Sequence, residues 1–195
     1  PYIYQGEELG MTNYPFQSVD EFRDIESVNA YREWCGEGTV PHEAFWPCIT
    51  FKSRDNARTP MQWDDSMHGG FTAATPWIAV NPNYTKINAK AQTANPNSVF
   101  HYYKKLIALR KENPIIVYGK YEAMLEDSEE LFVYTRTMND EKLLIVCSFC
   151  DYETNFTMPK GFVGAACLIS NTENSYDSAE LTLKPYEAFV LHCRP

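Results

Sequence analysis

The sequence predicts an α+β protein, with helices and long loops in its first part and a small antiparallel β domain in its second. Two observations lead to this prediction. One strongly periodic helix spans residues 97–112, and from Ile115 onward short strand-like runs are separated by turn residues. The change in character near Gly119 indicates a boundary, so we expect one domain over residues 1–118 and a second over residues 119–195.

The overall composition excludes several classes of function. The chain has 195 residues and an apolar content of 44%, which is typical of soluble globular proteins. Its formal net charge of −9 argues against a general nucleic-acid binder, which needs a basic face. No apolar run approaches the roughly 20 residues of a membrane-spanning helix. We therefore expect neither nucleic acid nor a membrane among its partners.

The spacing of cysteine and histidine indicates neither a disulfide framework nor a metal site. A chain of this size does not need disulfides, so the six cysteines are predicted to be free and mostly buried, as in a reducing, cytoplasmic compartment. Cys147 and Cys150 have C-x-x-C spacing, but they lie within a predicted strand, and we expect buried strand cysteines there. The four histidines lack ligand spacing, and neither a nucleophile elbow nor a Walker loop is present. We expect no metal and no cofactor.

The first part of the chain contains several short elements. Residues 1–5 are apolar and aromatic and predict a short buried strand. Residues 7–15 predict a loop that begins with adjacent carboxylates. Apolar residues at helical spacing predict a short helix that begins at Ser27 and ends near Gly36. Residues 36–50 show no clear period, so their structure stays undetermined.

The segment from Ser53 to Trp63 is the strongest candidate for a binding loop. It combines two guanidinium groups, a carboxylate, two side-chain amides and an indole, a mixture that suits a polar ligand better than a core. Asn56 and Pro60 disfavour a helix, and ordered loops are where binding groups tend to lie. Two interpretations stay open, because arginines in such a loop either bind a ligand or pair with nearby carboxylates.

Four aromatic residues accompany this loop in a long irregular region. Rings beside planar polar groups suit the apolar face of a sugar, but they also anchor long loops onto a core. We expect the anchoring role for most of them. The four residues are Trp63, Phe71, Trp77 and Tyr84.

The second part of the chain begins after a well-delimited helix. Asn97 or Ser98 can cap the helix over residues 97–112, an apolar stripe runs along one face, and Pro114 ends it. The turn residues Met138–Glu141 predict a hairpin, and the strand spacing indicates an antiparallel sandwich or an open barrel. The predicted strands are residues 131–137, 142–149, 155–158, 163–170, 179–183 and 188–193.

Several motifs together resemble the family 13 glycoside hydrolases. The segment Pro1–Asn13 resembles their last barrel strand and the following loop, and Ser53–Trp63 resembles the signature loop of their oligo-1,6-glucosidase-like branch. The resemblance covers essentially the whole chain, although residues 36–50 depart from the expected helical pattern. Further matches lie at residues 81–84, 87–88, 102–110 and 183–188.

The resemblance implies that the chain is a fragment. Family members have a (β/α)8 barrel, an insertion domain and a C-terminal antiparallel β domain. This chain would begin at the last barrel strand, include the last barrel helices over residues 1–118, and finish with a small β-sandwich domain over residues 119–195. The catalytic carboxylates of the family lie on earlier strands, upstream of Pro1, so no carboxylate of this chain inherits their roles.

The resemblance transfers two substrate contacts to this chain. Glu26 matches a glutamate near the subsite for the leaving group, and Arg54 matches an arginine that lines the same entrance. A Glu–Arg pair in that place supplies oriented, charge-assisted hydrogen bonds to sugar hydroxyls. The alternative is a salt bridge that only shapes the loop.

The implied function is that of the C-terminal part of a retaining α-glucosidase acting on short α-1,6- or α-1,4-linked glucosides. Its partners would be an α-glucoside oligosaccharide and the N-terminal barrel segment. Alone, we expect the chain to be inactive and to self-associate through apolar faces that the barrel would cover.

Two alternatives stay open. One is part of a trehalose-6-phosphate hydrolase, although no Arg or Lys cluster for a phosphate is evident. The other is a stand-alone carbohydrate-binding or interaction module.

Overall fold

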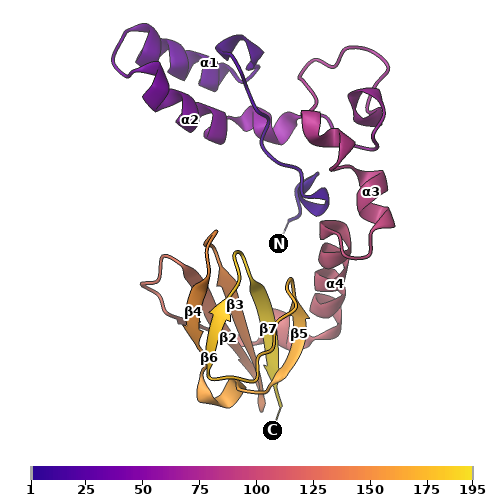
Figure 1. The fold of residues 1–195 in the computed structure, drawn as a ribbon, viewed down its shortest axis with the longest axis vertical. Coiled ribbons are helices and arrows are strands. Elements are labelled where there is room, and N and C mark those ends of the chain that lie inside the picture. The colour runs from indigo at the N-terminus through magenta and orange to yellow at the C-terminus, as the bar shows by residue number, and fades with distance from the viewer. Residues whose placement is uncertain (1, 195) are drawn as a thin grey trace. The chain divides into compact units, whose positions relative to one another are not determined.

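The computed structural model describes residues 2–194 and shows two compact units (Figure 1). The N-terminal unit is Pro1–Tyr103 and the C-terminal unit is Lys104–Pro195. The N-terminal unit is built from helices and loops, and all strands of residues 2–194 lie in the C-terminal unit. The N-terminal unit contains α1 (Ile25–Tyr31), α2 (His42–Lys52) and α3 (Ala89–Ala94), with short 3-10 and π-helical turns between them, and the start of a longer helix described below.

The predicted strand at residues 1–5 is wrong for residues 2–5, and Pro1 lies outside the described residues. Tyr2, Ile3 and Tyr4 form no strand, and their side chains are exposed. A strand needs a hydrogen-bonded neighbour, and within residues 2–103 no strand is present to supply one. An apolar pattern alone is therefore not enough to form a strand here.

Helices α1 and α2 pack together and form the core of the N-terminal unit. The predicted helix from Ser27 to Gly36 is confirmed as α1 followed by a π-helical turn, Arg32–Gly36. Helix α2 lies in the region for which no structure was predicted. The sequence shows no helical period there because the apolar residues of α2 are spread around the helix and Pro47 lies inside it. The buried core residues are Phe16, Phe22 and Ile49, with Tyr14, Val19, Val28, Tyr31, Phe45 and Trp46 packed against them.

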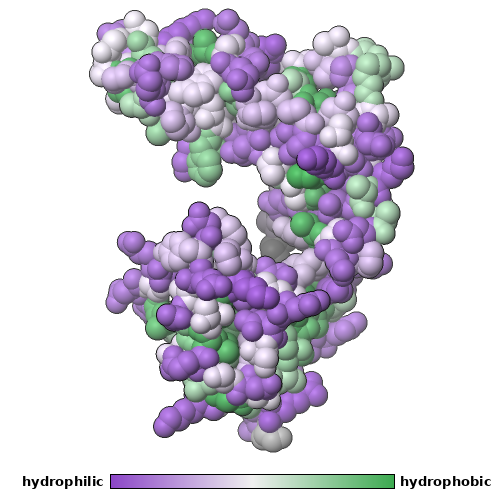
Figure 2. Space-filling view, in the orientation of Figure 1, coloured by the Kyte–Doolittle hydropathy of each residue, from purple (hydrophilic) through white to green (hydrophobic). Residues whose placement is uncertain are grey.

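Helix α4 (Val99–Glu112) confirms the predicted helix over residues 97–112. Ser98 accepts a hydrogen bond from the backbone N–H of His101 at 3.4 Å, as a capping residue does. Pro114 ends α4, and a second short helix, α5 (Pro114–Tyr118), begins at this proline. Figure 2 shows hydrophobic residues at the surface over α3 and α4, and the apolar stripe of α4 is exposed at Val99, Leu106 and Ile107.

The C-terminal unit contains two antiparallel sheets and confirms the six predicted strands as β2 to β7, whereas β1 was not predicted. One sheet has five strands in the order β1-β2-β3-β7-β5, and the other pairs β4 with β6. The predicted hairpin is β2–β3, and Asn139 in its turn has φ +53°, a conformation that asparagine tolerates. The strands are β1 (Lys120–Met124), β2 (Leu131–Met138), β3 (Glu141–Ser148), β4 (Thr154–Thr157), β5 (Ala166–Ser170), β6 (Glu180–Leu183) and β7 (Ala188–Cys193).

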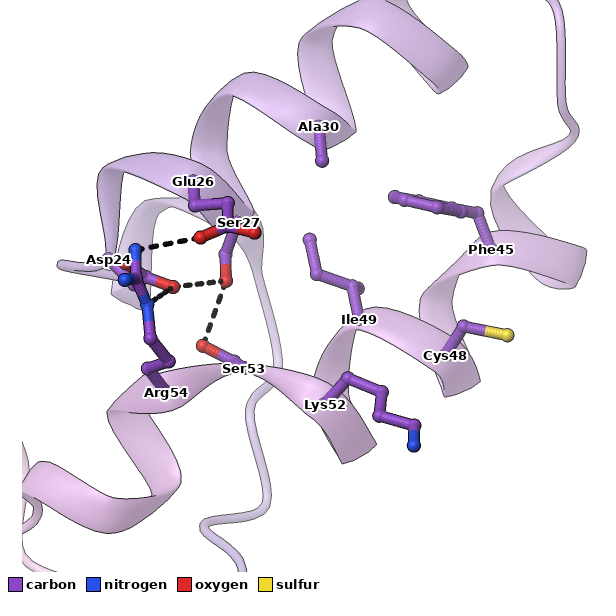
Figure 3. Close-up of a pocket in the computed structure, with 10 residues that line it drawn as sticks. All are labelled: Asp24, Glu26, Ser27, Ala30, Phe45, Cys48, Ile49, Lys52, Ser53 and Arg54. Atoms are coloured by element: carbon purple, nitrogen blue, oxygen red, sulfur yellow. Dashed lines mark hydrogen bonds and ion pairs between the residues drawn. The ribbon is translucent and has the colours of Figure 1, made fainter.

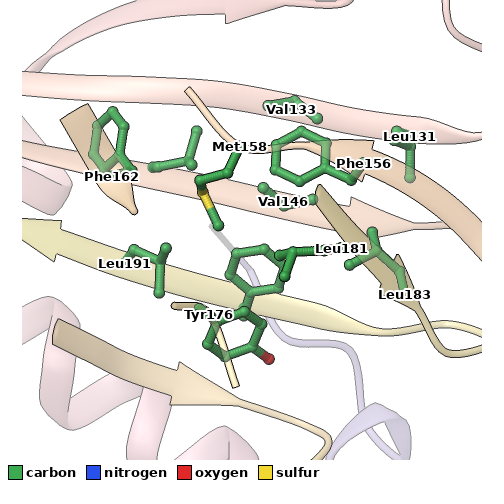
Figure 4. Packing of buried hydrophobic residues seen from close by; sticks show 12 residues of the cluster. Leu131, Val133, Val146, Phe156, Met158, Phe162, Tyr176, Leu181, Leu183 and Leu191 are labelled. Carbon is green, nitrogen blue, oxygen red and sulfur yellow. The ribbon is translucent and has the colours of Figure 1, made fainter. Parts of the chain in front are cut away.

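Side chains from both sheets meet in the largest core of the protein (Figure 4). Alternate residues of β2, β3 and β7 point into it, as do Phe156 from β4 and Leu183 from β6. The other face of the five-stranded sheet carries a smaller cluster, in which Ile115 of α5 packs on Leu143 and Ile145. Helix α5 therefore covers part of this face.

All six cysteines are free, but the prediction that most are buried is wrong. Only Cys150 is buried, and Cys48 and Cys167 are exposed. Cys167 lies on β5, which forms one edge of the five-stranded sheet, and Cys48 lies at an exposed position of α2. The apolar neighbours in the sequence did not reveal that these two positions are at a sheet edge and at the surface of a helix.

Candidate functional site

The segment from Ser53 to Trp63 is an ordered loop, as predicted, and begins with a 3-10 turn, Arg54–Arg58. Ser53 ends α2, and its hydroxyl accepts a hydrogen bond from the backbone N–H of Asp55 at 3.3 Å. The turn that follows brings Arg54 and Asp55 into contact with Asp24, the residue before α1.

Asp24, which precedes α1, holds Arg54 in place (Figure 3). Nη2 and Nε of Arg54 donate to the two carboxylate oxygens of Asp24 at 2.7 and 3.2 Å. Ser27 donates to the same carboxylate at 3.1 Å. The Asp24 side chain is only 4% exposed, and the hydrogen bond from Arg54 outweighs burial and lowers the pKa of Asp24. The carboxylate therefore remains charged and fixes the plane of the guanidinium group.

The two predicted site residues, Glu26 and Arg54, form an ion pair. Nη2 of Arg54 lies 2.9 Å from Oε2 of Glu26, and the side chains are 53% and 75% exposed, respectively. No residue in the range 2–194 accepts a hydrogen bond from Nη1 of Arg54. Arg54 is thus anchored on its buried side by Asp24 and retains a free donor on its open side. Its contact with substrate stays a prediction.

Asp55 is the fully buried acid of the loop. Its Oδ2 accepts hydrogen bonds from the backbone N–H groups of Arg23 and Asp24 at 2.6 and 2.9 Å. Its Oδ1 lies 3.6 Å from Arg58, which is also 3.6 Å from Asp24. Asp55 and Arg58 therefore position the segment that carries Asp24, which is the structural role that the ion-pair interpretation predicts.

Sequence reasoning missed Asp24, which is the main partner of Arg54. The available signal was its place in Arg23–Glu26, a few residues before the helix predicted from Ser27, in a region where a carboxylate is favoured. That position gives no indication of a contact with a residue 30 positions further along the chain.

Polar contacts connect three of the sequence motifs. Gln62 donates to the side-chain oxygen of Asn83 at 3.0 Å, and Asn83 donates to the hydroxyl of Thr12 at 2.9 Å. Asn81 also donates to the backbone oxygen of Thr12 at 3.0 Å. The loop from Ser53 to Trp63, the residues 81–84 and the loop after Gly6 are therefore fixed to one another.

Two hollows open on either side of the chain at Lys52, Ser53 and Arg54. One, of about 310 Å³, lies between α1 and α2 and is partly lined by Glu26 and Arg54 (Figure 3). The other, of about 370 Å³, lies between the 3-10 turn and the first residues of the chain. These volumes are at the lower end of the range of ligand sites in proteins. The predicted pair Glu26–Arg54 thus lies at the rim of a hollow that is large enough for a small ligand.

Most of the four aromatic residues of this region are not buried in a core. Trp63, Phe71 and Trp77 are largely exposed, and Tyr84 is half-buried. The expectation that most of these rings anchor loops onto a core is therefore wrong in this structure. Exposed indole rings offer apolar surface together with a polar N–H group.

The described residues show neither a metal centre nor a membrane-spanning helix. No group of three or more His, Cys, Asp or Glu side chains in residues 2–194 is placed to hold a metal ion. In the same range, every helix is too short or too polar to cross a membrane.

Comparison with known proteins gives consistent matches. A family model described as "Alpha amylase, catalytic domain" matches residues 1–119. The oligo-1,6-glucosidase of Parageobacillus thermoglucosidasius is 51% identical over 100% of this chain and 35% of its own length. The trehalose-6-phosphate hydrolase of Bacillus subtilis is 43% identical over 97% of this chain and 34% of its own length.

Solved structures with the same fold include two enzymes with different names. The trehalose-6-phosphate hydrolase of Bacillus licheniformis has a TM-score of 0.92 at 46% identity and covers 100% of this chain and 36% of its own. An isomaltulose synthase of Erwinia rhapontici has a TM-score of 0.92 at 40% identity, and the match covers 100% of this chain and 35% of the synthase chain. The chain spans about a third of the length of the curated relatives that it matches. On this evidence the chain belongs to the alpha-amylase catalytic domain family of glycoside hydrolases and is similar over its whole length to oligo-1,6-glucosidases.

Proposed function

We propose that this chain is the C-terminal part of a retaining α-glucosidase that hydrolyses short α-1,6- or α-1,4-linked glucosides. The observation that carries the proposal is the anchored Arg54, which has a free donor at the rim of two hollows in a chain similar to oligo-1,6-glucosidases. The longer enzyme that would contain this chain is called the parent enzyme below. In it, the nucleophile and the general acid/base would come from outside this chain.

Within this proposal, the chain forms the wall that binds the leaving-group sugar. Arg54 donates from Nη1 to a sugar hydroxyl, and the exposed carboxylate of Glu26 accepts from a neighbouring hydroxyl. Asp24 does not touch the sugar, but it holds the guanidinium group in a single orientation. An oriented donor binds with a smaller loss of side-chain entropy than a free arginine would.

The same proposal assigns the two parts of the chain. Residues 1–118 belong to the end of the catalytic barrel, and residues 119–195 form a β-sandwich domain that stabilises it. The family match that stops at residue 119 and the core between two sheets support this assignment. Free thiols at all six cysteines support a reducing compartment, the cytoplasm.

The test of the proposed function is hydrolysis of 4-nitrophenyl α-glucopyranoside. The 195-residue chain is expected to release no nitrophenol above background, and the parent enzyme is expected to release it with retention of the anomeric configuration. Hydrolysis by the isolated chain, or inversion by the parent enzyme, would contradict the proposal.

A second candidate is part of a trehalose-6-phosphate hydrolase, because two enzymes of that name are 43% and 46% identical to this chain. A phosphate would need free cations, and Lys52 is the one lysine in the described lining of either hollow. We favour the glucoside because the relatives at 50% and 51% identity are oligo-1,6-glucosidases. Turnover of trehalose 6-phosphate and isomaltose by the parent enzyme separates the two candidates.

The isolated chain is expected to self-associate. Val99, Leu106 and Ile107 expose an apolar stripe on α4 that the rest of the parent enzyme would cover. Replacing Leu106 and Ile107 by Lys together should reduce the association. Light scattering at several protein concentrations measures the effect, and a clean monomer for the unmodified chain at all of them would contradict the prediction.

A further inference from the structure

The hollow between α1 and α2 has an apolar floor with charged groups at both ends (Figure 3). Ala30 of α1 faces Ile49 and Phe45 of α2 across the hollow. The ion pair of Glu26 and Arg54 lies at one end, and Lys52 lies toward the other end, near Cys48. The hollow therefore continues beyond the proposed contacts of the leaving-group sugar.

Lys52 is a second cation of this hollow, and none of its donors is engaged. Arg54 uses Nε and Nη2 for Asp24 and Glu26 and keeps only Nη1, which the proposed function assigns to the leaving-group sugar. Within residues 2–194, the ammonium group of Lys52 forms no ion pair and no hydrogen bond. Its Nζ lies 5.7 Å from the centre of the Phe51 ring. An ammonium group carries three donors, so all of them can bind a ligand.

This combination of groups suits a pyranose ring. The C–H face of a sugar packs on apolar side chains, while its hydroxyls need hydrogen-bond partners at the edge of the ring. Ala30, Phe45 and Ile49 supply the apolar surface, and Lys52 supplies the donors. A volume of about 310 Å³ is near the lower limit for ligand sites and suits one sugar residue rather than a long chain.

We infer that this hollow binds the next sugar residue of an oligosaccharide, beyond the one held by Glu26 and Arg54. Lys52 is then a residue that determines specificity for substrate length. The inference rests on the proposed function, because that function places the leaving group at Glu26 and Arg54. It adds a second leaving-group subsite, formed by α1 and α2.

The exposed thiol of Cys48 reports on this hollow without any turnover. Cys48 lines the hollow, whereas Cys167 is exposed in the C-terminal unit and serves as an internal control. Iodoacetamide labelling of the 195-residue chain, followed by peptide mass spectrometry, gives the rate at each cysteine. With isomaltotriose near saturation, we expect labelling of Cys48 to slow about fivefold or more, because a site filled to 80% is blocked for that share of the time. The rate at Cys167 should not change.

Two variants and their controls make the test specific. Ala30→Leu fills the hollow and should abolish the protection of Cys48. Ala94→Leu, at an exposed site on α3, should retain the protection.

Lys52→Gln should lower the kcat/KM of the parent enzyme for isomaltotriose relative to isomaltose by about tenfold, the effect of one charge-assisted hydrogen bond. Lys86→Gln, another exposed lysine, should leave this ratio unchanged.

Failure of the inference can be distinguished from failure of the proposed function. If Cys48 of the folded chain is labelled at the same rate with and without isomaltotriose, and Lys52→Gln leaves the ratio unchanged, the subsite does not exist. The parent enzyme would still hydrolyse the aryl glucoside in that case. Absence of all glucoside hydrolysis would instead contradict the proposed function.

Discussion

Asp55→Ala is expected to lower the free energy of unfolding of the N-terminal unit by about 3 kcal/mol. Asp55 is fully buried and accepts two backbone hydrogen bonds, from Arg23 and Asp24. Removing the carboxylate leaves both donors without a partner and takes one acidic neighbour from Arg58. The segment that carries Asp24 would then lose its support, so the anchor of Arg54 should loosen at the same time.

Tryptophan fluorescence measures this effect selectively. All four tryptophans lie between Trp34 and Trp77, in the N-terminal unit, so urea unfolding followed by their emission reports that unit alone. Asp65→Ala is the matched control, because Asp65 forms an exposed ion pair with Lys90 and should cost less than about 0.5 kcal/mol. Equal shifts in the two variants would contradict the structural role of Asp55.

Glu187→Ala is expected to destabilise the C-terminal unit by about 3 kcal/mol. Glu187 is fully buried and accepts hydrogen bonds from the backbone N–H of Lys184 at 2.8 Å, from Asn174 at 3.1 Å and from the hydroxyl of Tyr176 at 2.9 Å. These contacts join the loop before β7 to the loop after β5. Truncation would leave the backbone N–H of Lys184 and the side-chain amide of Asn174 without this partner around a cavity, while Tyr176 keeps its contact with Ser170.

The contribution of Glu187 should also depend on pH. Burial raises the pKa of this carboxyl, but the hydrogen bonds from Lys184, Asn174 and Tyr176 outweigh burial, so the pKa lies below its usual value. The folded state then binds a proton less readily than the unfolded chain. Its contribution is therefore complete above about pH 5 and is lost as the pH falls below about 4.

Hydrogen–deuterium exchange of β3 and β7 peptides, measured at pH 7 and again near pH 3, follows the stability of the C-terminal unit. Glu187→Ala should speed exchange strongly at pH 7 and less near pH 3. Glu153→Ala, at an exposed position, is the control and should have little effect. Exchange in Glu187→Ala that matches the unmodified protein at pH 7 would show that the buried hydrogen bonds contribute nothing measurable.

The local patterns that predicted β2 to β7 were reliable because their causes are local. Strand residues alternate between core and surface in β4 and β6, and turn residues such as Asn139 adopt backbone conformations that few other residues tolerate. Helix α4 was predictable for the same reason, since its cap and its terminating proline are adjacent to it in sequence.

The remaining features depend on contacts between distant residues. The apolar residues 2–5 resemble a strand, but a strand forms only beside a partner. Helix α2 contains Pro47 and lacks a single apolar stripe, so it is held by packing on Phe16 and Phe22 rather than by its own periodicity. Neither fact can be read from a window of ten or fifteen residues.

The candidate site was predictable only in part. Glu26 and Arg54 were found through the resemblance, and the structure pairs them. Asp24 makes the stronger contact with Arg54 but was missed, because nothing in the sequence connects the two positions. The hollow beside Lys52 depends on how α1 packs on α2, which no local pattern specifies.

The most direct measurement of the central claim is isomaltose hydrolysis by the parent enzyme with Arg54→Ala and, separately, Arg58→Ala. Both arginines pair with Asp24, but only Arg54 lines the two hollows. We predict that Arg54→Ala lowers kcat/KM at least about tenfold, the loss of one charge-assisted hydrogen bond, and that Arg58→Ala lowers it less while the enzyme remains folded. Equal losses in the two variants, or unchanged kcat/KM in Arg54→Ala, would contradict the assignment of this loop to the substrate entrance.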